Sequence, residues 1–147
     1  MAQGDLTVFE EFALDIGSEK HNFPSDSLKL GLIDSTAAPT AADASPTWGD
    51  YSGNEVSGSG YVAGGATLCG VTYTEASGVA TLDDTSNVTW SQDASGPTNI
   101  YYGVLYNDSE ASDAAICYID MGGPVSLQNG DVNVTWNASG ILTVTVS

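Results

Sequence analysis

The chain has 147 residues, of which 41% are hydrophobic, and a formal net charge of −17 from 19 acidic and two basic residues. Its length fits one domain, and its hydrophobic fraction excludes a disordered chain. Two lysines without any arginine cannot neutralise a phosphate backbone or an anionic lipid surface, so we expect neither nucleic acid nor a membrane as a partner.

The N-terminal stretch MAQGDLTVFEEF lacks the basic region and the apolar core of a signal peptide. The chain has no apolar run that approaches the ~20 residues of a membrane span. We therefore expect the protein to be made in a cytosol.

Residues 1–27 are predicted to form an N-terminal helix and arm. Thr7 and Glu10 have the T-x-x-E spacing of a capping box, and Gly17 is a natural stop. A helix this short is marginal alone, so we expect it to dock on its own sheet or on a neighbouring subunit. Its apolar face consists of residues at three- and four-residue steps, namely Val8, Phe9, Phe12, Ala13 and Ile16.

Residues 28–33 (LKLGLI) are expected to be the first strand of a β domain that spans residues 28–147. A long extended loop follows at 34–66. Its first part, 34–47, has small side chains, two prolines and no periodicity, which indicates an arm or loop of the length that is usually functional or mobile. Its second part, 48–66, combines glycines with aromatic residues, which predicts an irregular but ordered region.

The remaining chain alternates strand and turn, with period-two apolar patterns that indicate one buried and one wet face. Asp83–Asp84 is predicted to be a turn, and Asn129–Gly130 is a strong hairpin signal. These strands predict a mostly β single domain over residues 1–147, an antiparallel β-sandwich or jelly-roll-like fold with one short N-terminal helix. The patterned ranges are 67–73, 79–82, 87–91, 99–106 (with Ile100, Tyr102, Val104 and Tyr106 alternating), 114–121, 131–136 and 141–146.

Few residues are suited to catalysis or to metal binding. His21 is the only histidine, no G-x-S-x-G motif is present, and we expect this histidine to be solvated. Cys69 and Cys117 are predicted to be buried thiols in a reducing compartment, although their spacing leaves a disulfide open. One histidine and two cysteines do not make a zinc site. The acidic pairs Glu10–Glu11 and Asp83–Asp84 are interpreted as a helix face and a turn, not as glycosidase carboxylates.

We accordingly expect no enzymatic activity, no cofactor and no metal. Calcium has weak candidates at Asp83–Asp84 and at residues 107–110. Aromatic residues of the glycine-rich loop are interpreted as a protein anchor, a sugar platform, or side chains that pack on the sheet. Together with the helix and the arm they give the predicted protein interface, which consists of Phe9, Phe12, Pro39, Pro46, Trp48, Tyr51 and Tyr61.

The block WGDYSGNEVSGSGYVAGGATL, residues 48–68, resembles a signature of small structural proteins of tailed bacteriophages. Later pieces agree in kind and order: VTW at 88–90, IYYGVLYND at 100–108, ICYIDMGG at 116–123 and TWNASGILTVTV at 135–146. The resemblance implies a capsid decoration or cement protein that binds the major capsid protein on the outer capsid surface, as a homotrimer, and stabilises the shell.

Two further interpretations remain open at this point. One is a tail, neck or fibre component of the virion. The other is a carbohydrate-binding module that mediates surface adhesion.

If the protein acts through a stable contact with another subunit, we expect this contact to bury more than about 1,200 Å² of surface.

Overall fold

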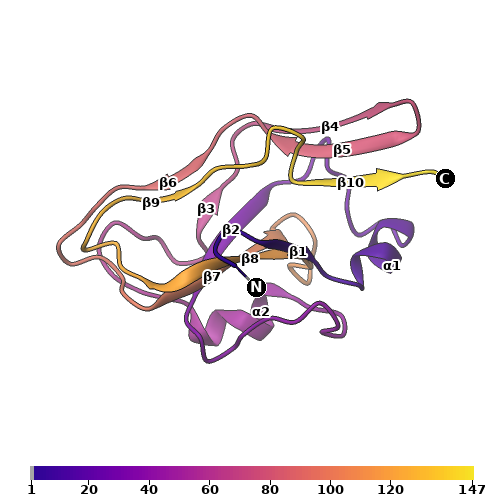
Figure 1. The fold of residues 1–147 in the computed structure, drawn as a ribbon. Coiled ribbons are helices and arrows are strands. Elements are labelled where there is room, and N and C mark those ends of the chain that lie inside the picture. The colour runs from indigo at the N-terminus through magenta and orange to yellow at the C-terminus, as the bar shows by residue number, and fades with distance from the viewer. Residues whose placement is uncertain (1) are drawn as a thin grey trace.

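The computed structural model describes residues 2–147 and is mostly β, with 38% strand and 9% helix, as the alternation predicts. Within these residues the main sheet has five antiparallel strands in the order β1-β8-β7-β2-β3 (Figure 1). The bounds of these strands are Leu6–Val8 for β1, Leu28–Ile33 for β2, Ala66–Thr67 for β3, Ile100–Asn107 for β7 and Ala115–Val125 for β8.

Two smaller antiparallel sheets, β10-β5-β4 and β6-β9, lie over one face of the main sheet (Figure 1). They form the second layer of a sandwich. The opposite face is covered by helix α2, Trp48–Tyr51, and by the 3₁₀ turn η1, Ser52–Asn54. The strands of the second layer are Val71–Ala76 for β4, Val79–Asp84 for β5, Val88–Trp90 for β6, Val132–Val134 for β9 and Leu142–Thr145 for β10.

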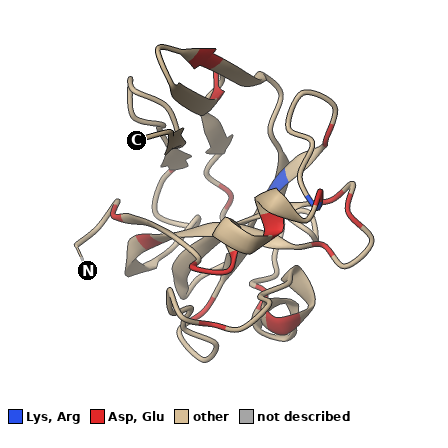
Figure 2. Ribbon diagram, turned by 90° about the vertical axis from the view of Figure 1, so that its right-hand side faces the viewer, with Lys and Arg blue, Asp and Glu red and all other residues tan. Residues whose placement is uncertain are grey.

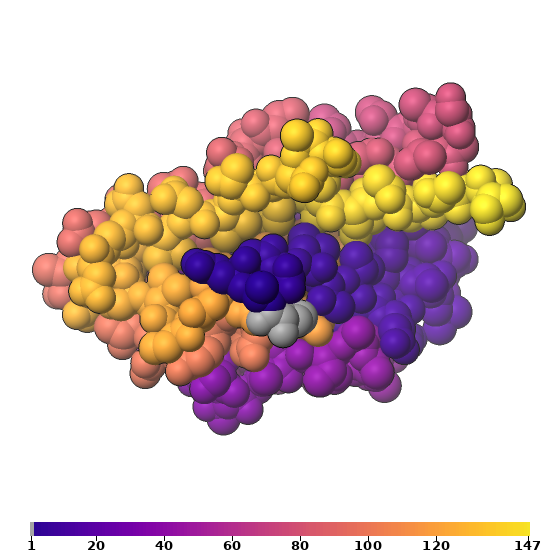
Figure 3. All heavy atoms as spheres, viewed as in Figure 1, coloured from indigo at the N-terminus to yellow at the C-terminus, as the bar shows by residue number. Residues whose placement is uncertain are grey.

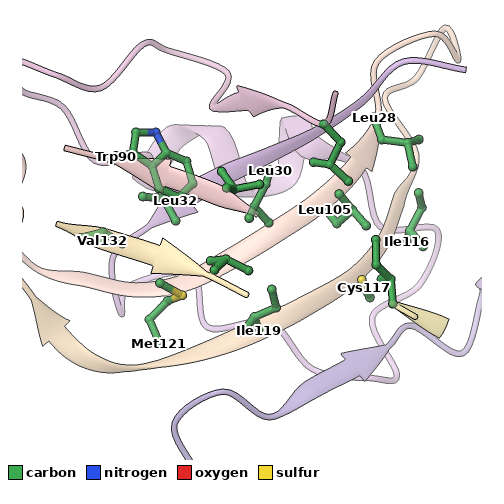
Figure 4. Packing of buried hydrophobic residues seen from close by; sticks show 14 of the residues in the cluster. Leu28, Leu30, Leu32, Trp90, Leu105, Ile116, Cys117, Ile119, Met121 and Val132 are labelled. Atoms are coloured by element: carbon green, nitrogen blue, oxygen red, sulfur yellow. The ribbon is translucent and has the colours of Figure 1, made fainter. Parts of the chain in front are cut away.

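Apolar residues form two clusters, one on each face of the main sheet. The larger cluster fills the sandwich, where Leu30, Leu32 and Met121 of the main sheet face Trp90 and Val132 of the second layer (Figure 4). The smaller cluster lies beneath α2 and includes Phe9, Ile33, Trp48, Tyr51, Val104, Tyr106, Ala115 and Tyr118. Because both faces of β2 are covered, its sequence is an almost continuous apolar run.

The prediction for residues 1–27 is only partly right. Helix α1 runs from Phe12 to Gly17 and stops at the predicted glycine, but residues 6–8 form strand β1 instead of a first helical turn. Thr7 pairs with Tyr118 of β8, and no side chain caps the helix. The backbone bonds to β8 and the burial of Phe9 outweigh a local capping signal. The sheet therefore begins with the N-terminal segment and not at residue 28.

The predicted turn at Asp83–Asp84 is wrong, because β5 continues through both residues. The hairpin that joins β4 to β5 turns instead at Ser77–Gly78, where both residues have positive φ angles. Strand β6 then pairs with β9 and not with β5. The predicted strand 67–73 is also divided, since β3 and β4 belong to different sheets.

Candidate binding groove

The seven residues predicted to form a protein interface are all buried within the chain. This corrects the expectation that they face a neighbour. Phe12 and Tyr61 belong to the sandwich core, whereas Phe9, Trp48 and Tyr51 pack beneath α2. The physical reason is that the arm folds back on the main sheet, so that these rings bury their apolar area in the monomer itself.

The arm is tied down by backbone and side-chain hydrogen bonds. The backbone N–H of Glu10 donates to the carbonyl of Ala41 (2.9 Å), and that of Ala115 donates to the carbonyl of Pro46 (2.8 Å). The hydroxyl of Tyr51 donates to Oδ2 of Asp43 (2.7 Å). The first part of the predicted loop, through Tyr51, is consequently an ordered cover over one face of the main sheet, whereas Tyr61 in its later part packs in the sandwich core.

The glycine-rich stretch is held by a network around Glu55. Oε1 of Glu55 accepts from the hydroxyl of Tyr61 (2.7 Å) and from the N–H of Gly64 (2.6 Å). The same tyrosine accepts from the N–H of Leu32 (2.9 Å), and Tyr106 donates to the carbonyl of Gly64 (2.6 Å). Burial together with the adjacent carboxylate raises the pKa of Tyr61. Tyr61 therefore organises the backbone and offers no ring to a ligand.

His21 is buried, which corrects the prediction of a solvated histidine. Its ring packs against Phe12 and Phe23, with centroid distances of 5.7 and 5.3 Å, and these two rings also contact each other at 6.1 Å. Nδ2 of the fully buried Asn107 donates to Nδ1 of His21 (3.1 Å) and to Oδ2 of Asp26 (2.6 Å). Burial lowers the pKa of His21 despite the nearby carboxylates. The imidazole is thus a structural group shielded from solvent.

The two cysteines differ in environment. Cys69 lies between β3 and β4 and is exposed, whereas Cys117 in β8 is buried, and both are free thiols. The prediction of buried thiols is therefore right for Cys117 and wrong for Cys69. Complete burial raises the pKa of the Cys117 thiol.

A groove of about 470 Å³ opens between the N-terminal segment and the chain at residues 133–141. Figure 3 views the face on which these two segments, indigo and yellow, lie beside each other. The apolar lining of the groove consists of side chains of the sandwich core, namely Ile119, Met121, Val134 and Ile141. Its polar lining includes Gln3, Asp5, Asp120, Asn133, Thr135 and Asn137.

Trp136 also lines the groove and is half-buried. Its indole Nε1 is shielded from solvent and has no hydrogen-bond partner within residues 2–147. A buried N–H without an acceptor costs free energy, of the order of 1–3 kcal/mol. Trp136 therefore carries a buried donor that residues 2–147 leave unsatisfied.

The groove runs along an unpaired strand edge. β1 is the outermost strand of the main sheet, and its partner in residues 2–147 is β8. The N–H of Phe9 donates to Ile116 (3.1 Å), and the carbonyl of Asp5 accepts from Asp120 (3.0 Å). Because antiparallel bonding alternates along a strand, the backbone groups of Leu6 and Val8 point away from β8.

The charges around the groove are negative. Both lysines are occupied elsewhere, in ion pairs of Lys20 with Asp15 (2.9 Å) and of Lys29 with Asp108 (3.1 Å). Acidic residues are spread over many elements in Figure 2, whereas the blue segments of the lysines lie close together. The groove itself is lined by Asp5 and Asp120 and by no basic residue from the described part of the chain.

Residues 2–147 contain no group of three or more His, Cys, Asp or Glu side chains placed to hold an ion. At the weak calcium candidate, Oδ1 of the buried Asp84 accepts from the N–H groups of Gly70 (2.7 Å) and Ser86 (3.2 Å). None of the helices in this range is long and apolar enough to span a membrane.

None of the groove residues was predicted from the sequence. The nearest signal is the expected strand 131–136, whose alternation includes Trp136. Comparisons with family models, with curated proteins and with solved structures find no match for this chain.

Proposed function

We propose that this chain is a structural protein of a tailed-bacteriophage virion, which binds the major capsid protein on the outer capsid surface and stabilises the shell. The observation that carries the proposal is where the fold places its apolar side chains. Its large aromatic anchors are buried internally, and an apolar-floored groove beside a free strand edge opens on an acidic surface. The resemblance of residues 48–68 to phage structural proteins supports the same function.

A decoration protein needs a rigid scaffold and a contact that many copies repeat. The cover formed by α2 and the arm rigidifies one face of the main sheet. The groove lies outside this cover and is available for a partner. Binding as a homotrimer multiplies a modest contact into strong attachment, because the second and third contacts become intramolecular. The acidic remainder keeps the coated particle soluble.

Carbohydrate binding is the second candidate, and the composition of the groove favours it. An indole ring beside amide and carboxylate side chains is a combination that suits a polar ligand with apolar faces. Here these groups are Trp136, Asn133, Asn137, Asp5 and Asp120. A tail, neck or fibre position would use the same groove on a different protein of the virion.

Co-sedimentation tests the proposal. The purified chain is mixed with shells that lack it, and separately with tails, of the phage whose genome encodes it. We expect saturable pelleting with shells and a higher temperature of shell disruption. Pelleting with tails alone, or no pelleting together with retention on a glycan column, would contradict capsid decoration. Analytical ultracentrifugation should show a trimer, and a monomer at high concentration would contradict the homotrimer.

A further inference from the structure

The free edge of β1 offers backbone groups in the pattern that an added strand requires. Residues 3–6 line the groove, and β1 runs from Leu6 to Val8, so its extended edge is about 10 Å long at ~3.3 Å per residue. Leu6 and Val8 direct their N–H and carbonyl groups outward along it. Extended peptides bind such edges through main-chain hydrogen bonds, and pockets for alternate side chains give specificity.

The groove has an apolar and a polar surface. An extended peptide can present apolar and polar side chains alternately to match them. Ile119 and Met121 provide an apolar floor, and Asp5 and Asp120 are among the polar residues that line it. A strand directs successive side chains to opposite sides, so apolar and polar residues in alternation match this arrangement.

The charge of the groove selects a basic segment. Oδ2 of Asp5 accepts from the N–H of Ala2 (2.8 Å), and Oδ1 of Asp120 accepts from that of Gly122 (2.7 Å). These bonds fix the carboxylates of two residues that line the groove, and their negative charge favours a cation nearby. A second copy of this chain is poorly complementary, since each copy has a net charge of −17 and both of its lysines are paired.

From these observations we infer that the groove binds an extended, lysine- or arginine-containing segment of the partner protein, which adds a strand to the edge of β1. This inference rests on the proposed function, because it specifies the surface through which the capsid partner is held. The unpaired backbone of β1 favours a peptide over a glycan, which would leave that edge unpaired.

A peptide probe tests strand addition directly. The probe is an acetylated, amidated peptide of about eight residues in which valine and lysine alternate, long enough to cover the edge of β1. Its matched control has the same sequence and charge, but alternate amides are N-methylated. We expect the first peptide to bind at least about tenfold more tightly. Amide exchange at Leu6 and Val8 should slow on binding, while exchange along β4, an edge strand of the second layer, should not change. Equal binding of the two peptides, or no protection at Leu6 and Val8, would overturn the inference.

Charge variants separate specific from diffuse attraction. Asp5→Asn with Asp120→Asn keeps an oxygen acceptor at each position, and Glu10→Gln with Glu19→Gln removes the same charge at exposed sites outside the groove. We expect the groove variant to bind the peptide roughly tenfold more weakly than the control variant. Equal weakening of both variants would show general attraction only and would contradict a groove site. Binding on a glycan array that Trp136→Phe abolishes, without peptide binding, would replace the peptide by a carbohydrate.

Shell co-sedimentation distinguishes this inference from the proposed function. If the unmodified chain and the groove variant pellet equally with shells, the groove is not the capsid contact, although the decoration function stands. If the unmodified chain does not pellet but the peptide protects Leu6 and Val8, the groove binds a strand and the decoration function fails. If the unmodified chain pellets with shells and the groove variant pellets less, both the inference and the decoration function are supported.

Discussion

The indole ring of Trp48 lies against Gly31, so that a Cβ on this glycine would overlap the six-membered ring. On β7, Tyr106 stacks on the same indole at a centroid distance of 4.9 Å and an interplanar angle of 4°. Trp48 starts α2 and Gly31 lies in the centre of β2. This contact joins the arm to the main sheet, and the absence of a side chain at residue 31 makes it possible.

Gly31→Ala should destabilise the protein by about 1–3 kcal/mol, because the added methyl group forces the indole away from β2. Urea unfolding followed by tryptophan fluorescence measures the change. Gly53→Ala is the matched control, since a Cβ at residue 53 meets no atom within 4 Å. We expect that control to change the free energy of unfolding by less than ~0.5 kcal/mol. Equal effects of the two substitutions would show that the contact between Trp48 and Gly31 contributes little.

Asn107→Ala should be more damaging, at about 2–4 kcal/mol, because it leaves buried partners without their hydrogen bonds. The side chain of Asn107 is fully buried and bonds to His21, Asp26 and the carbonyl of Lys20. Denaturant unfolding provides the measurement. Asn87→Ala removes an exposed amide and serves as the control. A loss below ~1 kcal/mol at residue 107 would contradict the structural role given to this network.

The two thiols should react at very different rates with a thiol reagent such as dithionitrobenzoate. Cys69 is exposed and should react in the folded protein, whereas Cys117 is buried and its raised pKa disfavours the thiolate. We expect one equivalent to react before denaturation and a second only after it. Cys69→Ser should abolish the fast phase, and Cys117→Ser should retain it. Fast reaction of both thiols in the unmodified protein would contradict the placement of β8 in the core.

Alternation in the sequence predicted the β character and most strands of this fold, because one-sided burial is recorded locally. Alternation did not predict which face of the sheet a side chain occupies at positions where the register between paired strands shifts. An irregularity between Ile100 and Tyr102 places Ile100 in the sandwich core, while Val104 and Tyr106 face α2. Ile100 therefore does not share the face of the tyrosines and Val104, although the spacing suggests that it does.

Pairings between distant segments were also hidden. Thr7 and Tyr118 are neighbours in the main sheet, although they are far apart in sequence. The groove arises from such pairings, since residues 3–6, 119–121 and 133–141 meet only after folding. No local motif marks these residues as a set. The aromatic residues that did suggest a site are the ones with the most apolar area to bury, so the fold places them inside.

The stability of the protein should fall as the pH is lowered through the ordinary pKa of histidine, about 6.5. Burial against Phe12 and Phe23 lowers the pKa of His21 in the folded state, so the unfolded chain binds the proton more readily. The contribution of the neutral imidazole is therefore complete above about pH 6.5 and is lost as the pH falls toward the lowered folded pKa.

Chemical denaturation at several pH values between about 8 and 5 measures this dependence, and His21→Phe provides the comparison. Phenylalanine keeps a ring in the stack but cannot take up a proton, so the variant should lose less stability than the unmodified protein over this pH range. The carboxylates of Asp15, Asp26 and Glu110 near residue 21 remain in both proteins. Parallel stability curves for the two proteins would show that His21 is not buried in its neutral form. A shallower curve for the variant would establish the histidine as the source of the difference.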